Sequence, residues 1–235
     1  MQFTSYTGGV VTLLKTGHEQ HEQHTGVECL MTNFEPLLYD AVCKYLPQNC
    51  RAAEVGSFKG GSACILWNGM HRRGKSLVLA CHDLFQPSDL HDERADFEPV
   101  FDLNVRTWDA GVIKVKGDSK VTHAIHAPGH LDYCFVDGDH TYEGAKADIL
   151  NFYPKVAKDG WFLVQDCIGD VERAVKDTMG RETDVFSFLI SPPMGHYVRV
   201  FHRDKSVLTS FLDDLHNTVA RLDQTATTLE FPALE

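Results

Sequence analysis

Short apolar segments alternate along the chain with longer amphipathic ones, and this alternation predicts the fold. Runs such as Leu77–Cys81 and Trp161–Val164 are apolar without interruption, a pattern typical of strands covered on both faces. Seven segments of this kind are predicted to be β-strands: Arg51–Ser57, Ser76–Asp83, Val112–Gly117, Leu131–Asp137, Trp161–Asp166, Asp184–Ile190 and His196–His202.

The segments between these strands have the periodicity of amphipathic helices. Helices are predicted at 61–73, 92–108, 119–126, 141–157 and 170–179, with one more at Pro36–Tyr45 ahead of the first strand. Helices of this length between strands indicate βαβ crossovers and a parallel sheet. The connection Ser191–Gly195 is too short for a crossover, so one strand at that edge is expected to run antiparallel. The sequence therefore predicts an α/β fold, with a doubly wound, mostly parallel seven-stranded sheet and an antiparallel edge hairpin.

No repeat, low-complexity tract or linker divides the chain, so we expect one main domain over residues 36–220. Residues 1–35 are irregular and polar, and we interpret them as a candidate lid or a contact with a second subunit. Residues 221–235 have the character of a C-terminal tail.

The amino-acid composition narrows the classes of molecule that the protein could bind. Acidic residues outnumber basic ones by 33 to 22 in the 235-residue chain, giving a formal charge of −11 that disfavours nucleic acid and anionic lipid. No apolar run approaches the roughly 18 residues of a membrane span. The seven cysteines sit singly, and the N-terminus lacks a secretory signature. We therefore expect a cytoplasmic protein with a small-molecule partner, while a second copy of the chain stays open as a partner.

Ligands of doubly wound sheets bind beyond the carboxyl ends of the strands, so the residues there are the candidate site. The first strand runs into the glycine-rich turn Glu54–Ser62, where the backbone can approach a ligand closely. Its spacing is G-x-x-x-G-G, which does not fit the G-x-G-x-x-G dinucleotide fingerprint. Asp83 ends the second strand and either accepts hydrogen bonds from ribose hydroxyls or caps the next loop. Asp118 and Ser119 end the third, as a helix N-cap or a contact to adenine.

The fourth strand carries the densest polar signal. It continues into Asp137-Gly138-Asp139-His140-Thr141-Tyr142-Glu143, whereas the fifth ends at Asp166. Capping by Asp139 beside a solvated His140 is the purely structural interpretation. The acids exceed what capping requires, and neighbouring carboxylates either perturb each other's pKa or share a cation.

Taken together, these residues resemble the class I S-adenosylmethionine-dependent O-methyltransferases. The similarity is greatest to the small-molecule subgroup that contains the cephalosporin-tailoring and macrolide-sugar methyltransferases. It covers about residues 50–202, and Leu131–Asp166 is its most specific part. The turn Glu54–Ser62 is also similar to that of catechol-type O-methyltransferases.

The resemblance implies a Rossmann-like methyltransferase fold with S-adenosylmethionine as the cofactor. Asp83 would hold the ribose hydroxyls, and Asp118 with Ser119 would border the adenine. Asp137 also lies at the cofactor. The residues implied at the methionine part come from the turn after the first strand: Glu54, Gly56, Ser57, Phe58 and Ser62.

The resemblance also implies a catalytic centre and a metal site. Asp137 and Asp166 match metal ligands, so magnesium or calcium is a candidate cofactor. The metal-dependent relatives have two adjacent ligands where this chain has Gln165-Asp166-Cys167; an amide oxygen from Gln165 suits a hard cation and a thiol does not. His140 falls where the catechol enzymes carry a catalytic lysine, and we expect it to act as general base, with Asp137 orienting the acceptor hydroxyl.

Two other functions remain open at this point. One is an NAD or nucleotide-sugar Rossmann enzyme, which titration with NAD against S-adenosylmethionine would separate. The other is a non-catalytic methyltransferase-like protein that binds the cofactor or a partner. That alternative predicts cofactor binding without methyl transfer.

Overall fold

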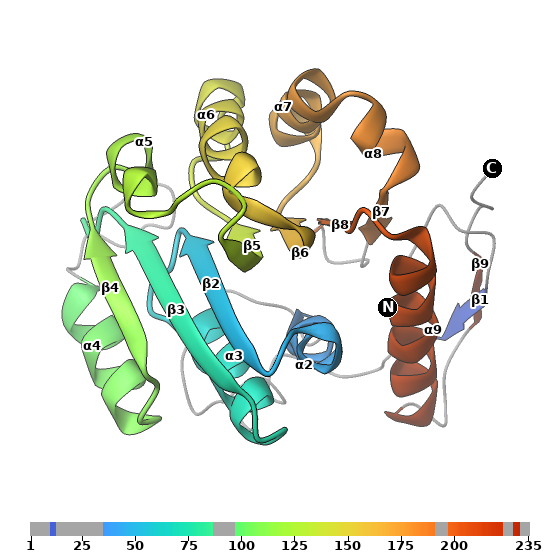
Figure 1. Cartoon of the computed structure of the whole chain (residues 1–235), viewed down its shortest axis with the longest axis horizontal. Helices are drawn as coiled ribbons and strands as arrows, with labels where there is room; N and C mark the ends of the chain where they lie inside the picture. The colour runs from blue at the N-terminus through green and yellow to red at the C-terminus, as the bar shows by residue number, and fades with distance from the viewer. Residues whose placement is uncertain (1–9, 13–34, 87–96, 191–196, 223–227, 231–235) are drawn as a thin grey trace.

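A seven-stranded sheet forms the centre of the molecule, in the order β4-β3-β2-β5-β6-β8-β7 (Figure 1). The computed structural model describes residues 10–12, 35–86, 97–190, 197–222 and 228–230. The strands are β2 (Asn49–Val55), β3 (Ser76–Asp83), β4 (Val112–Lys116), β5 (Leu131–Val136), β6 (Val156–Val164), β7 (Ser187–Ile190) and β8 (Val198–Phe201). Strands β4, β3, β2, β5 and β6 are parallel, and β8 is antiparallel to both β6 and β7. The predicted fold class is confirmed.

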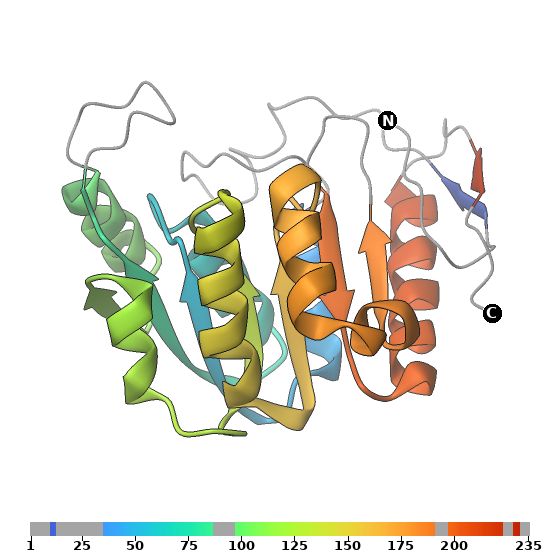
Figure 2. The ribbon, with the colours of Figure 1, turned by 90° about the horizontal axis from the view of Figure 1, so that it is seen from above.

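Helices cover both faces of this sheet (Figures 1 and 2). One layer contains α2 (Glu35–Tyr45), α3 (Gly61–His71), α4 (Glu98–Thr107) and α9 (Lys205–Leu222). The other contains α5 (Ser119–Thr122), α6 (Tyr142–Phe152) and α7 (Gly169–Met179), which is followed by the short α8 (Arg181–Val185). Side chains of β5 alternate between the layers: Tyr133 and Phe135 join the core of the first, Cys134 and Val136 that of the second.

Several predicted boundaries are corrected by the structure. The helix expected over 141–157 ends at Phe152 and is followed by a 3-10 turn over Tyr153–Lys155, in which Pro154 has no backbone N–H to continue the α-helical bonding. Strand β6 then begins at Val156 instead of Trp161. The helix expected over 119–126 is α5 followed by a 3-10 turn at His123–Ile125.

The end of the domain contains the largest departures. The strand expected from Asp184 begins only at Ser187, because α8 occupies the preceding residues. Helix α9 was not predicted, although Leu208, Phe211 and Leu215 recur at helical spacing and are buried. Asp204 accepts hydrogen bonds from the N–H groups of Ser206 and Val207 at the start of this helix.

Parts of the two terminal segments pair with each other. Strand β1 (Val10–Thr12) is antiparallel to β9 (Thr228–Glu230). The rest of the candidate lid in residues 1–35, and the connection Ser191–Gly195, lie outside the described residues. Residues 92–96 of the helix predicted over 92–108 also lie outside them, and α4 is the described part of that helix.

The described cysteines are buried free thiols, which agrees with their single placement in the sequence. Across the ranges that the structure describes, no helix has both the length and the apolar character needed to cross a membrane.

Two histidines are packed together beneath α5. His82 Nε2 lies 2.8 Å from His126 Nε2, and His82 Nδ1 lies 2.9 Å from the hydroxyl oxygen of Thr122. One imidazole must donate and the other accept across the 2.8 Å contact, so at most one of the two rings can be protonated. Burial, together with the neighbouring histidines, lowers the pKa of His82 to about 3.

This buried pair predicts a loss of stability in mild acid. Below pH 6.5 an unfolded His82 takes up a proton that the folded protein cannot bind until the pH reaches about 3. We expect His82 alone to remove about 2 kcal/mol of unfolding free energy between pH 7 and pH 5. Urea unfolding at the two pH values measures it, and His82→Gln should show the smaller loss. An equal loss in both proteins would contradict this role.

Candidate functional site

The turn after β2 is built around a buried carboxyl group. Glu54 is only 2% exposed and accepts hydrogen bonds from the hydroxyls of Ser57, at 3.1 Å, and Ser62. Burial raises the pKa of Glu54 to about 7, against the lowering effect of these hydroxyls. The two bonds tie the end of β2 to the first residues of α3 and fix the shape of the turn.

Asp83, at the end of β3, holds the same turn from the side. Its Oδ2 accepts the backbone N–H groups of Ser57 and Phe58 at 2.8 and 2.9 Å, and its Oδ1 accepts that of Phe85 at 2.8 Å. Phe58 has a φ of 45°, a conformation that bulky residues rarely adopt, and Asp83 stabilises it. Asp83 was predicted either to bind ribose hydroxyls or to cap the next loop. In either case it already organises the backbone of the turn.

Gly56 brings the ends of β2 and β5 into contact. Its φ is 84°, and a Cβ atom built on it would lie 1.9 Å from the carbonyl oxygen of Asp137 and 2.9 Å from Cα of Gly138. Only glycine fits this approach without displacing the Asp137 loop. The glycine-rich turn and the polar loop after β5 are thus parts of one site.

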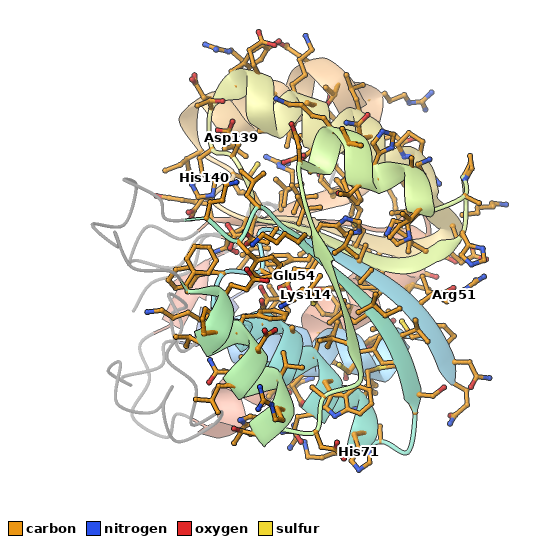
Figure 3. The ribbon with its side chains drawn as sticks, turned by 90° about the vertical axis from the view of Figure 1, so that its left-hand side faces the viewer. Arg51, Glu54, His71, Lys114, Asp139 and His140 are labelled. Carbon is orange, nitrogen blue, oxygen red and sulfur yellow. The ribbon has the colours of Figure 1, made fainter. Side chains whose placement is uncertain are left out.

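Asp137, His140 and Asp166 meet at the carboxyl ends of β5 and β6. His140 Nε2 lies 3.2 Å from Asp137 Oδ1, and His140 Nδ1 lies 3.7 Å from Asp166 Oδ2. One ligand-type atom from each residue falls within 4.8 Å of the others. The side chain of His140 is 41% exposed, so an incoming molecule can reach it. Figure 3 shows His140 at one end of the sheet and Arg51, near the start of β2, at the other.

The electrostatics of this cluster favour a cation. The hydrogen bond to Asp137 raises the pKa of His140, and the charges of Asp137, Asp166 and Asp139 act in the same direction against partial burial. The carboxylates at the strand ends thus create a region of negative potential at the mouth of the site.

The loop that carries His140 is only a few residues long and is held by a helix cap. Thr141 is the N-cap of α6, and its hydroxyl accepts the N–H of Gly144 at 3.1 Å. Asp139 accepts the N–H of Thr141 at 2.9 Å. The cap is therefore Thr141, and Asp139 supports the turn before it.

Asp118 and Ser119 lie on the far side of the β5 loop. Asp118 is the N-cap of α5 and accepts the N–H of Lys120 at 2.9 Å. Ser119 donates to Asp148 at 2.6 Å, and burial raises the pKa of Asp148 to about 6. Asp148 also lies against Gly138, so it joins this corner to the rest of the site.

Comparison with known proteins shows which domain and fold this chain resembles. Residues 53–167 match the family model described as a methyltransferase domain. The O-methyltransferase NovP is similar in structure, with 22% identity, a TM-score of 0.55 and coverage of 73% of this chain and 78% of NovP. No curated protein matches the chain.

Two further solved structures share the fold. The SAH-bound methyltransferase PaMTH1 of Podospora anserina has 12% identity and a TM-score of 0.55, covering 79% of this chain and 87% of its own. Cofactor-bound Rv0187 from MTB has 15% identity and a TM-score of 0.54, covering 79% and 88%. Residues 53–167 of the chain therefore form a methyltransferase domain, and these solved structures share its fold.

The methyltransferase brings its sequence-predicted residues together in three connected groups. The β2 turn contains Glu54, Gly56, Ser57, Phe58 and Ser62, and it contacts Asp83. Asp137, His140 and Asp166 form the second group, and Asp118 with Ser119 the third. Gly56 and Gly138 are the points at which the groups touch.

Asp148 was not singled out from the sequence. Its signal is an acid on the apolar face of α6, between the buried Ala145 and Ile149. Gln165 and Cys167 flank Asp166 but are both buried, whereas Asp166 is half-buried. In the cluster of described residues, Asp166 is thus the part of the Gln165–Cys167 segment that joins Asp137 and His140.

Proposed function

We propose that this methyltransferase methylates a hydroxyl group of a small molecule, with His140 as the general base. The observation that carries the proposal is the contact of His140 with Asp137 at the open ends of β5 and β6. The similarity to NovP, named an O-methyltransferase, supports oxygen as the acceptor atom. The net charge of −11 and the single cysteines support a small acceptor in a reducing cytoplasm and argue against nucleic acid.

The cofactor would occupy the three groups in order. The turn Glu54–Ser62 would surround the methionine part, and Asp118 with Ser119 would border the adenine. Within the described part of the chain, Asp83 Oδ1 accepts one backbone N–H, which leaves it capacity for a ribose hydroxyl. S-adenosylmethionine supplies an electrophilic methyl group when bound.

The chain's own contribution is to position an oxygen and remove its proton. An alcohol or phenol is a poor nucleophile until the proton leaves, and a base within hydrogen-bond reach accelerates this step. Neutral His140 would accept the proton, and the resulting imidazolium would be stabilised by Asp137 at 3.2 Å and Asp166 at 3.7 Å. Asp137 would also orient the acceptor hydroxyl.

Calorimetry followed by a transfer assay tests the function. S-adenosylmethionine and its demethylated product should bind, and NAD should not. A panel of phenols, sugars and hydroxylated metabolites should then yield a methylated product by mass spectrometry. Failure to bind S-adenosylmethionine would refute the proposal, whereas binding without transfer across the panel would favour the non-catalytic alternative.

The residues present also fit a divalent cation. Asp137 and Asp166 offer oxygen ligands of the kind that magnesium and calcium prefer, and their ligand atoms lie within one 4.8 Å cluster. A cation held there would lower the pKa of an acceptor hydroxyl. His140 would keep its role as the base.

Metal removal is expected to stop turnover. Chelator treatment should abolish methyl transfer, and added magnesium should restore it, because a cation held by Asp137 and Asp166 would lie near the acceptor. Asp166→Asn should raise the magnesium concentration needed for half-maximal rate and leave binding of S-adenosylmethionine unchanged. Asp170→Asn, an exposed acid on α7, is the matched control. Full activity after chelation would show that the carboxylates act without metal.

A further inference from the structure

Glu54 is a buried acid in a setting that offers it no positive charge. It lies in β2 opposite Cys81 of β3 and Phe135 of β5, and Figure 3 shows it inside the molecule. Its hydrogen-bond donors are the hydroxyls of Ser57 and Ser62 and the thiol of Cys81. Within the described residues, no lysine, arginine or histidine forms an ion pair with it.

The titratable groups that β3, β5 and the loop after β5 bring to Glu54 are neutral or negative. Cys81 of β3 and Tyr133 of β5 lie on the same face of the sheet as Glu54, and Cys134 of β5 lies on the other face. Burial raises the pKa of all three well above the ordinary range. Asp137, beyond β5, adds a negative charge that disfavours ionisation of Glu54. Serine hydroxyls can donate to a carboxylate or accept from a carboxylic acid, so the turn tolerates both states of Glu54.

We propose that Glu54 carries a proton in about half of the cofactor-free molecules at pH 7 and in most of them at pH 6.5, and that it releases this proton when the ammonium group of the cofactor's methionine part binds. This inference rests on the proposed placement of the cofactor over the turn Glu54–Ser62. The O–H bond of the acid breaks, the proton passes to the buffer, and the carboxylate that remains faces the incoming cation. Burial raises the pKa of Glu54 to about 7, which supports the protonated state.

Proton release makes cofactor binding depend on pH at one identified group. Below the pKa of Glu54, binding must expel a proton, so affinity falls as the pH decreases. Near pH 6.5 about three quarters of a proton should leave per cofactor bound, since the pKa is about 7. The ammonium of the free cofactor is itself protonated at that pH, so it contributes little to the count.

Calorimetry in buffers of different ionisation enthalpy measures this number directly. S-adenosylmethionine should release the proton at pH 6.5, and its demethylated product should release the same amount because it keeps the ammonium. 5′-Methylthioadenosine, which lacks the amino-acid part, should release none. Equal release with all three molecules would overturn the assignment to the ammonium.

Variants locate the proton on Glu54. Glu54→Gln should bind S-adenosylmethionine with heats that no longer depend on the buffer. Ser62→Ala removes a donor that lowers the pKa of Glu54, so at pH 7.5 it should release more protons than the unchanged protein. If Glu54→Gln does not fold, the carboxyl carbon resonances of ¹³C-labelled glutamate give the same answer, because one of them should shift to the ionised position on binding.

Different results would refute proton release by Glu54 and methyl transfer. Binding of S-adenosylmethionine without any proton release, or the same release from Glu54→Gln, would overturn this inference and leave the proposed function intact. Absence of binding would overturn the proposed function and this inference together.

Discussion

Alanine in place of His140 is expected to lower the rate of methyl transfer by about 10²–10⁴-fold, the contribution that a positioned general base makes. His140 approaches both Asp137 and Asp166, and its pKa is raised by the hydrogen bond to Asp137. If His140 is the base, its charged form would therefore be stabilised in place. The affinity for S-adenosylmethionine should change little, because the ring contacts the acceptor side of the site.

The measurement is kcat at saturating acceptor, with calorimetry of cofactor binding on the same preparation. Added imidazole should restore part of the rate in His140→Ala, because it can enter the space left by the ring. His71→Ala is the matched control, since His71 lies at the far end of α3 and is labelled in Figure 3 well away from His140. Undiminished kcat in His140→Ala would remove His140 from the mechanism.

Alanine at Gly56 is expected to destabilise the fold by about 3 kcal/mol or more and to abolish cofactor binding. The left-handed φ of 84° accounts for about 1–2 kcal/mol of this. The rest comes from the clash of the new Cβ with the backbone of Asp137, which must move by more than an ångström to make room. That movement displaces Asp137 from His140 and separates the two main groups of the site.

Gly129→Ala isolates the backbone contribution. Gly129 also has a left-handed φ, of 66°, but a Cβ on it would meet nothing within 4 Å. It should lose only the conformational part, about 1–2 kcal/mol in urea unfolding, and keep full cofactor affinity. If Gly56→Ala were as stable as Gly129→Ala, the contact between the β2 turn and the Asp137 loop would not be a structural requirement.

The sequence was most informative where hydrophobic pattern alone sets the structure. Uninterrupted apolar runs predicted β3 and β5 closely, because strands buried on both faces leave little freedom in composition. The start of β6 was missed, since Ala157–Gly160 contains exposed and polar residues and the register with β5 shifts across it, from Leu131 opposite Val156 to Tyr133 opposite Trp161. The position of β8 between β6 and β7 depends on pairing partners, which a hairpin pattern does not specify.

The candidate site likewise contains contacts that the sequence predicts and contacts that it does not. Asp137, His140 and Asp166 were predicted to meet, because the carboxyl ends of neighbouring parallel strands share one edge. The bond between Ser119 and Asp148 was not, since it joins α5 to α6 across 29 positions of sequence. Asp118 was predicted either to cap a helix or to contact adenine, and the structure shows it as the N-cap of α5. Its contact with adenine, like the roles of the other site residues, stays a prediction.

The loop from Gly138 to Thr141 is anchored at one end by the approach of Gly56 and at the other by the Thr141 cap. The position of His140, the proposed base, is therefore set by the sheet and by the cap of α6. A loop held in this way can be retained while the surfaces that would contact the acceptor change. Acceptor preference in this protein should accordingly evolve by exchange of segments remote from His140, with the proton-transfer machinery inherited intact.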